Sequence, residues 1–255
     1  MDHWEGKVAL VTGASVGIGA SIARELAKNG MKVIAVARRL EKLQELAANI
    51  KDEYKTDIYP MQCDVQKEED ILKVFEWAHE KLGGVDVLVN NAGVVHLETI
   101  IEGKTANYHH IMNVNVIAAA ICSRELVQSA KRRKTPAHIV NISSMAGHCP
   151  ELITYPISVY AASKSALNSM AATLRNELIN SKLDVKVTNI ILGTVETDMT
   201  AHYASYIEEN NICVLLAKDV ADTVVCVLST PHRVQITEMS VVPHLPARKA
   251  SELVK

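Results

Sequence analysis

The chain has 255 residues, a length that an α/β fold can reach around one sheet. Hydrophobic residues make up 48% of it and charged residues 22%, so it can bury a large core. Its formal net charge of −2 provides no basic field for nucleic acid or for an anionic membrane. We therefore expect small-molecule partners.

Neither a membrane span nor a secretion signal is expected. The longest apolar stretches, such as 85–89 and 187–192, are far shorter than the roughly 20 residues of a membrane helix. Residues 1–6 contain two acidic side chains and lack the basic segment and apolar stretch of a signal peptide. The five scattered cysteines include no C-x-x-C pair, so we expect neither disulfides nor a metal site, and we expect a reducing, cytoplasmic location.

Short apolar runs alternate with amphipathic segments along the whole chain, which indicates a parallel sheet with helices on both faces. The predicted strands are 7–12, 32–37, 57–62, 85–90, 137–142, 184–191 and 234–241. The predicted helices are about 17–29, 40–50, 71–82, 107–134, 158–181 and 218–229. We predict a single α/β domain over residues 1–255, of the doubly wound Rossmann type. It has a seven-stranded parallel sheet and binds ligands at the carboxyl ends of the strands.

The first predicted strand leads into a glycine-rich turn, TGASVGIG, at the start of a helix. Glycines permit a tight turn and let backbone amides approach a pyrophosphate, while the helix N-terminus supplies partial positive charge. The spacing G-x-x-x-G-x-G differs from the commoner dinucleotide fingerprint, and such a turn alone could be plain loop geometry. The cofactor-binding residues predicted here are Gly13, Ser15, Val16, Gly17, Ile18 and Gly19.

The second predicted strand ends in Ala37-Arg38-Arg39, where an NAD enzyme of this architecture would carry an acidic residue for the ribose 2′-hydroxyl. Two arginines can instead pair with a 2′-phosphate through charge-assisted hydrogen bonds. The alternative, arginines at a solvated helix start, is weaker because cations oppose the helix dipole there. We predict NADP(H) as the cofactor, with Arg38 as the main phosphate ligand and Arg39 as a lesser one.

Two more polar segments follow the third and fourth predicted strands. Asp64 and Val65 come after the third strand, and Asn91, Ala92 and Gly93 come after the fourth. Both segments can reach one cofactor across the edge of the sheet, so we predict cofactor contacts for all five residues. Each also has an ordinary explanation, since Asp64 could cap the next helix and the other segment could be a plain turn.

Tyr160 and Lys164 are four residues apart at the start of a predicted helix, so the phenol and the ammonium share one face. The positive charge should lower the pKa of Tyr160 and make it a usable acid/base near neutral pH. Ser144, after the fifth predicted strand, can hydrogen-bond a substrate oxygen. The pair taken alone could instead be an exposed helix face, with Ser144 capping a turn.

Taken together and in this order, these segments resemble the short-chain dehydrogenases/reductases over residues 7–242. The shared pattern comprises the TGASVGIG turn, Asp64, NNAG, Asn115, Ser144 and YAASK. The resemblance implies a catalytic tetrad of Asn115, Ser144, Tyr160 and Lys164. In it, Tyr160 is the general acid/base, Ser144 positions the substrate oxygen, Lys164 binds the nicotinamide ribose, and Asn115 holds a water of the proton relay.

The resemblance also places Gly193, Val195 and Thr197 at the nicotinamide carboxamide. Leu192 stands where the family usually has proline, which removes a rigid φ constraint from this loop. The loop between Ser144 and Tyr160 is longer than in the commonest family version and borders the expected substrate pocket.

Several stretches, including VARRLEKLQELA, ISSMAGH and LSTPHRVQI, resemble the insect farnesol dehydrogenase group and vertebrate relatives that reduce keto-steroids and other lipophilic carbonyls. This resemblance implies hydride transfer between NADP(H) and a lipophilic alcohol or carbonyl. It also implies a homodimer or homotetramer packed through 107–134 and 158–181. We expect an apolar pocket around the nicotinamide, formed by Val94, Val95, Leu97, Leu152, Ile153, Met199, Tyr203 and Tyr206.

Two alternatives use the same residues. A non-catalytic NADP(H)-binding sensor or scaffold could keep this fold, because fold does not establish function, although the complete tetrad argues against it. An isomerase or dehydratase would need an additional acid or base near the substrate, and His148 is the only obvious candidate.

Overall fold

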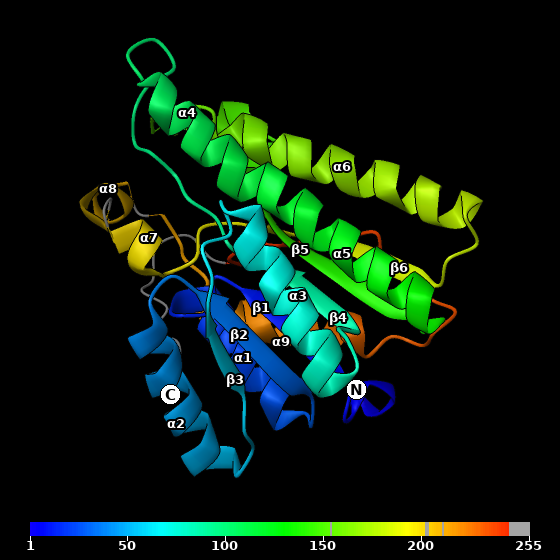
Figure 1. Ribbon diagram of the computed structural model, residues 1–255. Coiled ribbons are helices and arrows are strands. Elements are labelled where there is room, and N and C mark those ends of the chain that lie inside the picture. Colours follow the sequence, from blue (N-terminus) through cyan, green and yellow to red (C-terminus); the bar gives the residue numbers. More distant parts are fainter. Residues whose placement is uncertain (154, 202–203, 211, 245–255) are drawn as a thin grey trace.

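The computed structural model describes residues 1–153, 155–201, 204–210 and 212–244. Its centre is a seven-stranded sheet in which every pair of neighbouring strands is parallel. Across the sheet the order is β3-β2-β1-β4-β5-β6-β7, so the direction of winding reverses between β1 and β4 (Figure 1). The strands are β1 (Val8–Thr12), β2 (Lys32–Ala37), β3 (Tyr59–Gln62), β4 (Val87–Asn90), β5 (Ala137–Ser144), β6 (Val185–Leu192) and β7 (Glu238–Val241).

Helices lie on both faces of the sheet, which confirms the predicted doubly wound α/β fold class (Figure 1). They are α1 (Gly17–Lys28), α2 (Leu40–Tyr54), α3 (Glu68–Leu82), α4 (Thr105–Met112), α5 (Ala118–Arg133), α6 (Tyr160–Asn180), α7 (Asp198–Ala201), α8 (Ala204–Glu209) and α9 (Ala217–Leu228). Within the described ranges, no helix combines the length and the apolar character that crossing a membrane requires.

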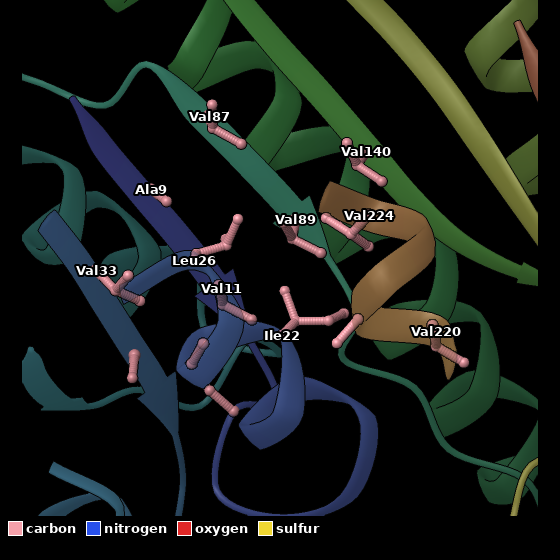
Figure 2. Close-up of a cluster of buried hydrophobic side chains, with 14 of the residues drawn as sticks. Ala9, Val11, Ile22, Leu26, Val33, Val87, Val89, Val140, Val220 and Val224 are labelled. Atoms are coloured by element: carbon pink, nitrogen blue, oxygen red, sulfur yellow. The ribbon is translucent and has the colours of Figure 1, made fainter. Parts of the chain in front are cut away.

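Two separate cores hold the helices against the sheet. On one face, side chains such as Val89 of β4 pack with Ile22 of α1 and Val224 of α9 (Figure 2). On the other face, α3, α5 and α6 cover side chains such as Leu88 and Ile139. Strands buried on both faces are continuous apolar runs, which explains the uninterrupted sequence VALVT of β1.

The segment predicted as one helix over 107–134 is not uniformly α-helical. After α4 the chain forms a π-helical turn, Asn113–Ile117, and only then continues as α5. Such turns are rare and are frequently found at functional sites. This one contains Asn115, whose side chain bonds to a neighbouring segment described below.

The last strand, β7, is shorter than the predicted range 234–241. It begins at Glu238, and just before it the Thr237 carbonyl oxygen accepts a hydrogen bond from the backbone N–H of Asn189 at 3.0 Å. The Ile236 carbonyl oxygen accepts from the Thr188 hydroxyl at 2.6 Å, so a side chain of β6 also holds this segment. The sequence pattern predicted the apolar character of the segment but not this side-chain contact.

α6 begins at Tyr160, two residues later than predicted. Ser158 has a φ of +50°, which lies outside the right-handed helical region, so it cannot be part of the first turn. The short helices α7 and α8 were not predicted, because segments of this length are too short to show a helical period.

Candidate active site

A cleft of about 490 Å³ lies at the carboxyl ends of the strands. All the predicted cofactor-binding residues line it, and so do Ser144, Tyr160 and Lys164. Asn115 is buried and is not among the lining residues of the described chain. The topology therefore brings together segments that are far apart in the sequence, at the place where doubly wound sheets bind ligands.

The glycine-rich turn packs directly against the segment that follows β4. Gly13 has a φ of +67°, and a Cβ added to it would lie 2.9 Å from the Cα of Ala92. The Thr12 hydroxyl oxygen accepts hydrogen bonds from the backbone N–H groups of Asn91 and Ala92, at 3.1 and 3.0 Å. A Cβ on Gly19 would lie 2.4 Å from the Gly13 carbonyl oxygen, so only glycine fits there. The two predicted segments thus form one unit.

The N-terminus of α1 faces the cleft without side-chain caps. Its N-cap, Val16, makes no side-chain hydrogen bond, and the first turn contains no acidic residue. Gly17 has a φ of +57° and lines the cleft, so backbone rather than side chain borders the space there. Uncapped N–H groups and the positive end of the helix dipole suit an anion, and the residues present therefore fit a pyrophosphate.

The end of the cleft beside β2 is positively charged. Arg38 and Arg39 both line it, and Arg39 Nη2 donates a hydrogen bond to Ser15 Oγ at 3.1 Å. The main chain of Arg38 is held by Gln62, whose Nε2 donates to its carbonyl oxygen at 3.0 Å. Ala37 stands where a carboxylate would repel an anion. This end of the cleft therefore suits an anionic group in addition to the pyrophosphate.

The reactive groups lie at the other end of the cleft. Tyr160 has a side-chain hydrogen bond with Ser144, and Lys164 Nζ lies 5.7 Å from the centroid of the Tyr160 ring. The lysine ammonium donates to the carbonyl oxygen of Ile142 at 2.9 Å. The three predicted side chains are therefore adjacent, and they rest on β5 and on the first turns of α6.

The pKa of Tyr160 is raised to about 12, so the expectation that Lys164 lowers it is wrong for this structure. Burial of the phenol is the largest cause; the hydrogen bond with Ser144 lowers the pKa, and nearby Tyr155 raises it. Burial also lowers the pKa of Lys164 to about 8. The apolar surroundings disfavour both charged forms, which outweighs the attraction that the i, i+4 spacing predicted.

Asn115 ties the segment after β4 to α6 from behind the cleft. Its Oδ1 accepts from the N–H of Val94 at 2.8 Å, and its Nδ2 donates to the Val94 carbonyl oxygen and to Ser163 Oγ, both at 3.0 Å. Both amide donors are used in this way. A Cβ on Gly93 would lie 3.5 Å from Asn115 Oδ1 and 3.7 Å from Lys164 Nζ, so the segment passes close to the lysine.

The loop after β6 closes over the glycine-rich turn. A Cβ on Gly17 would lie 3.4 Å from Thr197 Cγ2. The Thr200 hydroxyl, which the sequence did not single out, donates to the Val195 carbonyl oxygen and accepts from the Thr197 N–H, both at 2.9 Å. Leu192 pairs with β7, so the sheet fixes its backbone without a proline. No local sequence signal identified Thr200, because its partners depend on the fold of the loop.

The predicted apolar pocket is only partly correct. Of its eight predicted members, four line the cleft: Val94, Val95, Ile153 and Met199. Leu97 and Leu152 do not line the cleft, so their predicted place in the pocket is wrong. Their side chains are 42% and 70% exposed and face solvent. Tyr203 lies outside the described residues.

Tyr155 is a cleft residue that sequence reasoning missed. It lines the cleft, while its ring meets the ring of Tyr206 edge-on, with centroids 5.4 Å apart and an interplanar angle of 62°. Tyr206 itself does not line the cleft and supports Tyr155 from α8. Position 155 lies in the lengthened loop before Tyr160, and that length was the only available signal.

His148 does not support an isomerase or dehydratase. Its Nε2 lies 3.6 Å from a carboxylate oxygen of Glu238 on β7, and it is not among the described residues that line the cleft. The described residues also contain no cluster of three histidine, cysteine or acidic side chains that could hold a metal ion.

Comparison with known proteins agrees with this geometry. The family model for short chain dehydrogenases matches residues 7–207. Farnesol dehydrogenase from Aedes aegypti is 42% identical over 245 residues, which cover 95% of this chain and 98% of that protein. Dehydrogenase/reductase SDR family member 11 from Homo sapiens is 40% identical over 255 residues, with coverage of 95% and 96%.

Among solved structures, a metagenomic short-chain oxidoreductase in complex with NADP superposes with a TM-score of 0.79 at 30% identity, covering 95% of this chain and 99% of that one. The match thus includes the strand ends that form the cleft. From the cleft and from these similarities, the chain belongs to the short-chain dehydrogenase family, a family of oxidoreductases.

Proposed function

We propose that the protein transfers a hydride between NADP(H) and a lipophilic alcohol/carbonyl pair. The observation that carries this proposal is the arrangement of one cleft, with Ser144, Tyr160 and Lys164 at one end and two arginines at the other. A dinucleotide has a reactive nicotinamide at one end and an adenosine at the other. The cleft offers chemistry suited to each.

NADP(H), when bound, supplies or accepts the hydride. Arg38 and Arg39 would hold its 2′-phosphate, the glycine-rich turn its pyrophosphate, and Lys164 its nicotinamide ribose. Asp64, Val65 and the segment after β4 would line the path between them, with the 193–197 loop at the carboxamide. The NADP complex of the metagenomic relative supports this choice of cofactor.

Tyr160 would carry the proton that the substrate oxygen gains or loses. Its raised pKa keeps the phenol protonated at neutral pH, which is the form needed to donate a proton to a carbonyl oxygen during reduction. Ser144, already bonded to Tyr160, would bind the same oxygen. Asn115 would hold a water of the proton relay, as the family resemblance implies, and its side chain would keep the Val94 segment beside Lys164 ordered.

The substrate class follows from the side chains near Tyr160. Val94, Val95, Ile153 and Met199 present apolar surface, and Tyr155 adds an aromatic ring. An apolar pocket binds by removing ligand surface from water, at about 25 cal/mol per Å². The similarity to a farnesol dehydrogenase supports a terpenoid-sized or steroid-sized alcohol or ketone.

A substrate panel tests the proposal. It would contain terpenoid alcohols, keto-steroids, sugars and small hydroxy acids, each assayed with both NADPH or NADP⁺ and NADH or NAD⁺. We expect the highest kcat/KM for a lipophilic compound with the phosphorylated cofactor. Tyr160→Phe should bind cofactor normally and lose about 10²- to 10⁴-fold in turnover. A polyhydroxylated or charged best substrate would contradict the proposed class, and cofactor binding without any turnover would favour a sensor or scaffold.

We also propose assembly as a homodimer or homotetramer through α5 and α6, which cover the same face of the sheet (Figure 1). Ile117, before α5, and Ile179, in the last turn of α6, are exposed large apolar side chains. Light scattering coupled to size exclusion would test this directly. Replacing both residues with aspartate should produce smaller particles, and an unchanged mass would place the interface elsewhere.

A further inference from the structure

A pair of histidines lies at the edge of the cleft, outside the residues assigned above. His96 Nε2 and His110 Nδ1 are 2.9 Å apart, and their ring centroids are 5.1 Å apart. His110 belongs to α4 and lines the cleft. Because Nδ1 of His110 faces His96, Nε2 is its ring nitrogen that can contact a ligand.

Charged groups from two other segments of the cleft act on His110. Burial is the largest cause that lowers its pKa, and His96 and Arg38 lower it further, whereas Asp64 raises it. Arg38 follows β2 and Asp64 follows β3, and both line the cleft at the end proposed for the adenosine. His110 lines the same cleft as Arg38 and Asp64 and is close enough for both charges to act on it, so we place it near the phosphate-binding end. This histidine is thus the third basic residue there, after the two arginines.

We propose that His110 binds the 2′-phosphate of NADP(H), and that the His96–His110 pair takes up one proton from the solvent when this phosphate binds. The inference rests on the proposed NADP(H) dependence. A phosphate monoester carries a charge of about −1.5 to −2 near neutral pH, which offsets the repulsion between Arg38 and a protonated His110.

The geometry of the pair accommodates this proton. In the protonated state, His110 donates Nδ1–H to His96 Nε2 and Nε2–H to a phosphate oxygen. His96 remains neutral with its own hydrogen on Nδ1, so its Nε2 can accept. Asp64 is a carboxylate of the cleft whose charge favours the protonated form of His110. Each N–H group of the protonated His110 then has an acceptor.

The direction of the pH effect follows from linkage. If phosphate binding raises the pKa of His110, affinity for NADPH increases as pH decreases through the interval between the two pKa values. NADH lacks the 2′-phosphate and should show no such increase. The second ionisation of the phosphate itself, near pH 6, opposes the effect equally in every variant. Comparing variants therefore isolates the contribution of His110.

Titration calorimetry at pH 6.0, 7.0 and 8.0, in two buffers of different protonation enthalpy, tests the inference with NADPH and NADH. The wild-type protein should take up measurably more protons with NADPH than with NADH at pH 6.0 to 7.0. In His110→Gln this excess should disappear, and the Kd for NADPH should rise about 10-fold at pH 6.0 but less than about 3-fold at pH 8.0. The Kd for NADH should stay unchanged.

His109 provides the matched control, because it is adjacent in sequence but exposed, and it does not line the cleft. His109→Gln should behave as the wild type, and His110→Asn should repeat the effect of His110→Gln. Proton uptake that persists in both His110 variants, or an equal loss of affinity for NADPH and NADH, would overturn the inference alone. Equal wild-type affinities for the two cofactors would overturn the proposed NADP(H) dependence and this inference with it.

Discussion

Lys164 donates a hydrogen bond to the carbonyl oxygen of Ile142 at 2.9 Å, while its ammonium lies 5.7 Å from the centroid of the Tyr160 ring. A single carbonyl acceptor only partly offsets the cost of burying the ammonium, and burial lowers the pKa of Lys164 from 10.5 to about 8. The lysine is therefore held in the site at a cost in stability.

Lys164→Met should stabilise the protein while abolishing turnover. A fall of the pKa from 10.5 to about 8 corresponds to roughly 3 kcal/mol, reduced by about 1 kcal/mol for the lost Ile142 bond. The unfolded chain holds this proton up to pH 10.5, so the penalty is complete below pH 8 and disappears as pH rises to 10.5. Thermal unfolding at pH 7 and pH 10 measures the difference.

Lys73→Met is the matched control for that measurement, because Lys73 is an exposed residue of α3. It should change the free energy of unfolding by less than about 0.5 kcal/mol at either pH. A Lys164→Met protein that is less stable than the wild type at pH 7 would show that the lysine has compensating partners.

Ser144→Ala should move the rising limb of the pH profile for alcohol oxidation to higher pH. Oxidation requires the phenolate of Tyr160, and the hydrogen bond with Ser144 lowers the pKa of that phenol. Its removal raises the pKa, so a higher pH is needed to reach the same fraction of phenolate. The pH dependence of kcat/KM measures this, and a limb at the wild-type position would exclude a role of Ser144 in setting the ionisation.

Ala37→Asp combined with Arg38→Leu should reverse the cofactor preference from NADPH to NADH. A charged hydrogen bond contributes roughly 1.5 to 3 kcal/mol, so Arg38 alone can supply about 10- to 100-fold. The new carboxylate repels a 2′-phosphate and accepts from a free 2′-hydroxyl. Ratios of kcat/KM at low ionic strength test this, with Arg233→Leu, an exposed arginine that does not line the cleft, as the control. Equal kcat/KM values for NADPH and NADH in the wild-type enzyme would contradict the proposed role of Arg38.

His138 should make the protein sensitive to mild acid. The ring is buried, and its Nε2 lies 2.9 Å from the Thr188 hydroxyl, which itself donates to Ile236. Burial is the main cause that lowers the pKa of His138 to about 3. The unfolded chain binds this proton near pH 6.5, so stability is lost as pH falls from 6.5 toward 3, by about 1.4 kcal/mol per pH unit.

His138→Gln keeps a donor for Thr188 and does not titrate, so its urea midpoint should fall less than that of the wild type between pH 7 and pH 5. His79→Gln, on exposed α3 surface, should follow the wild type. Identical pH dependence of the His138 variant and the wild type would mean that another group dominates.

The fold class and most residues of the cleft could be predicted from the amino-acid sequence. Apolar runs alternating with helical segments predicted the parallel sheet, because each pattern reflects local burial. The residues at the strand ends, such as Gly13, Arg38 and Asn91, were placed in one site because a doubly wound sheet brings all its carboxyl ends to one edge. These inferences need only local pattern and topology.

Features that depend on neighbours distant in sequence became visible only in the folded protein. Burial, not spacing, sets the pKa of Tyr160, and no local pattern reports how much protein surrounds a side chain. Leu152 points to solvent, whereas Tyr155, three residues later, lines the cleft, because the path of an irregular loop depends on the surfaces against which it packs. The contact between His96 and His110 likewise exists only because the chain after β4 turns back against α4.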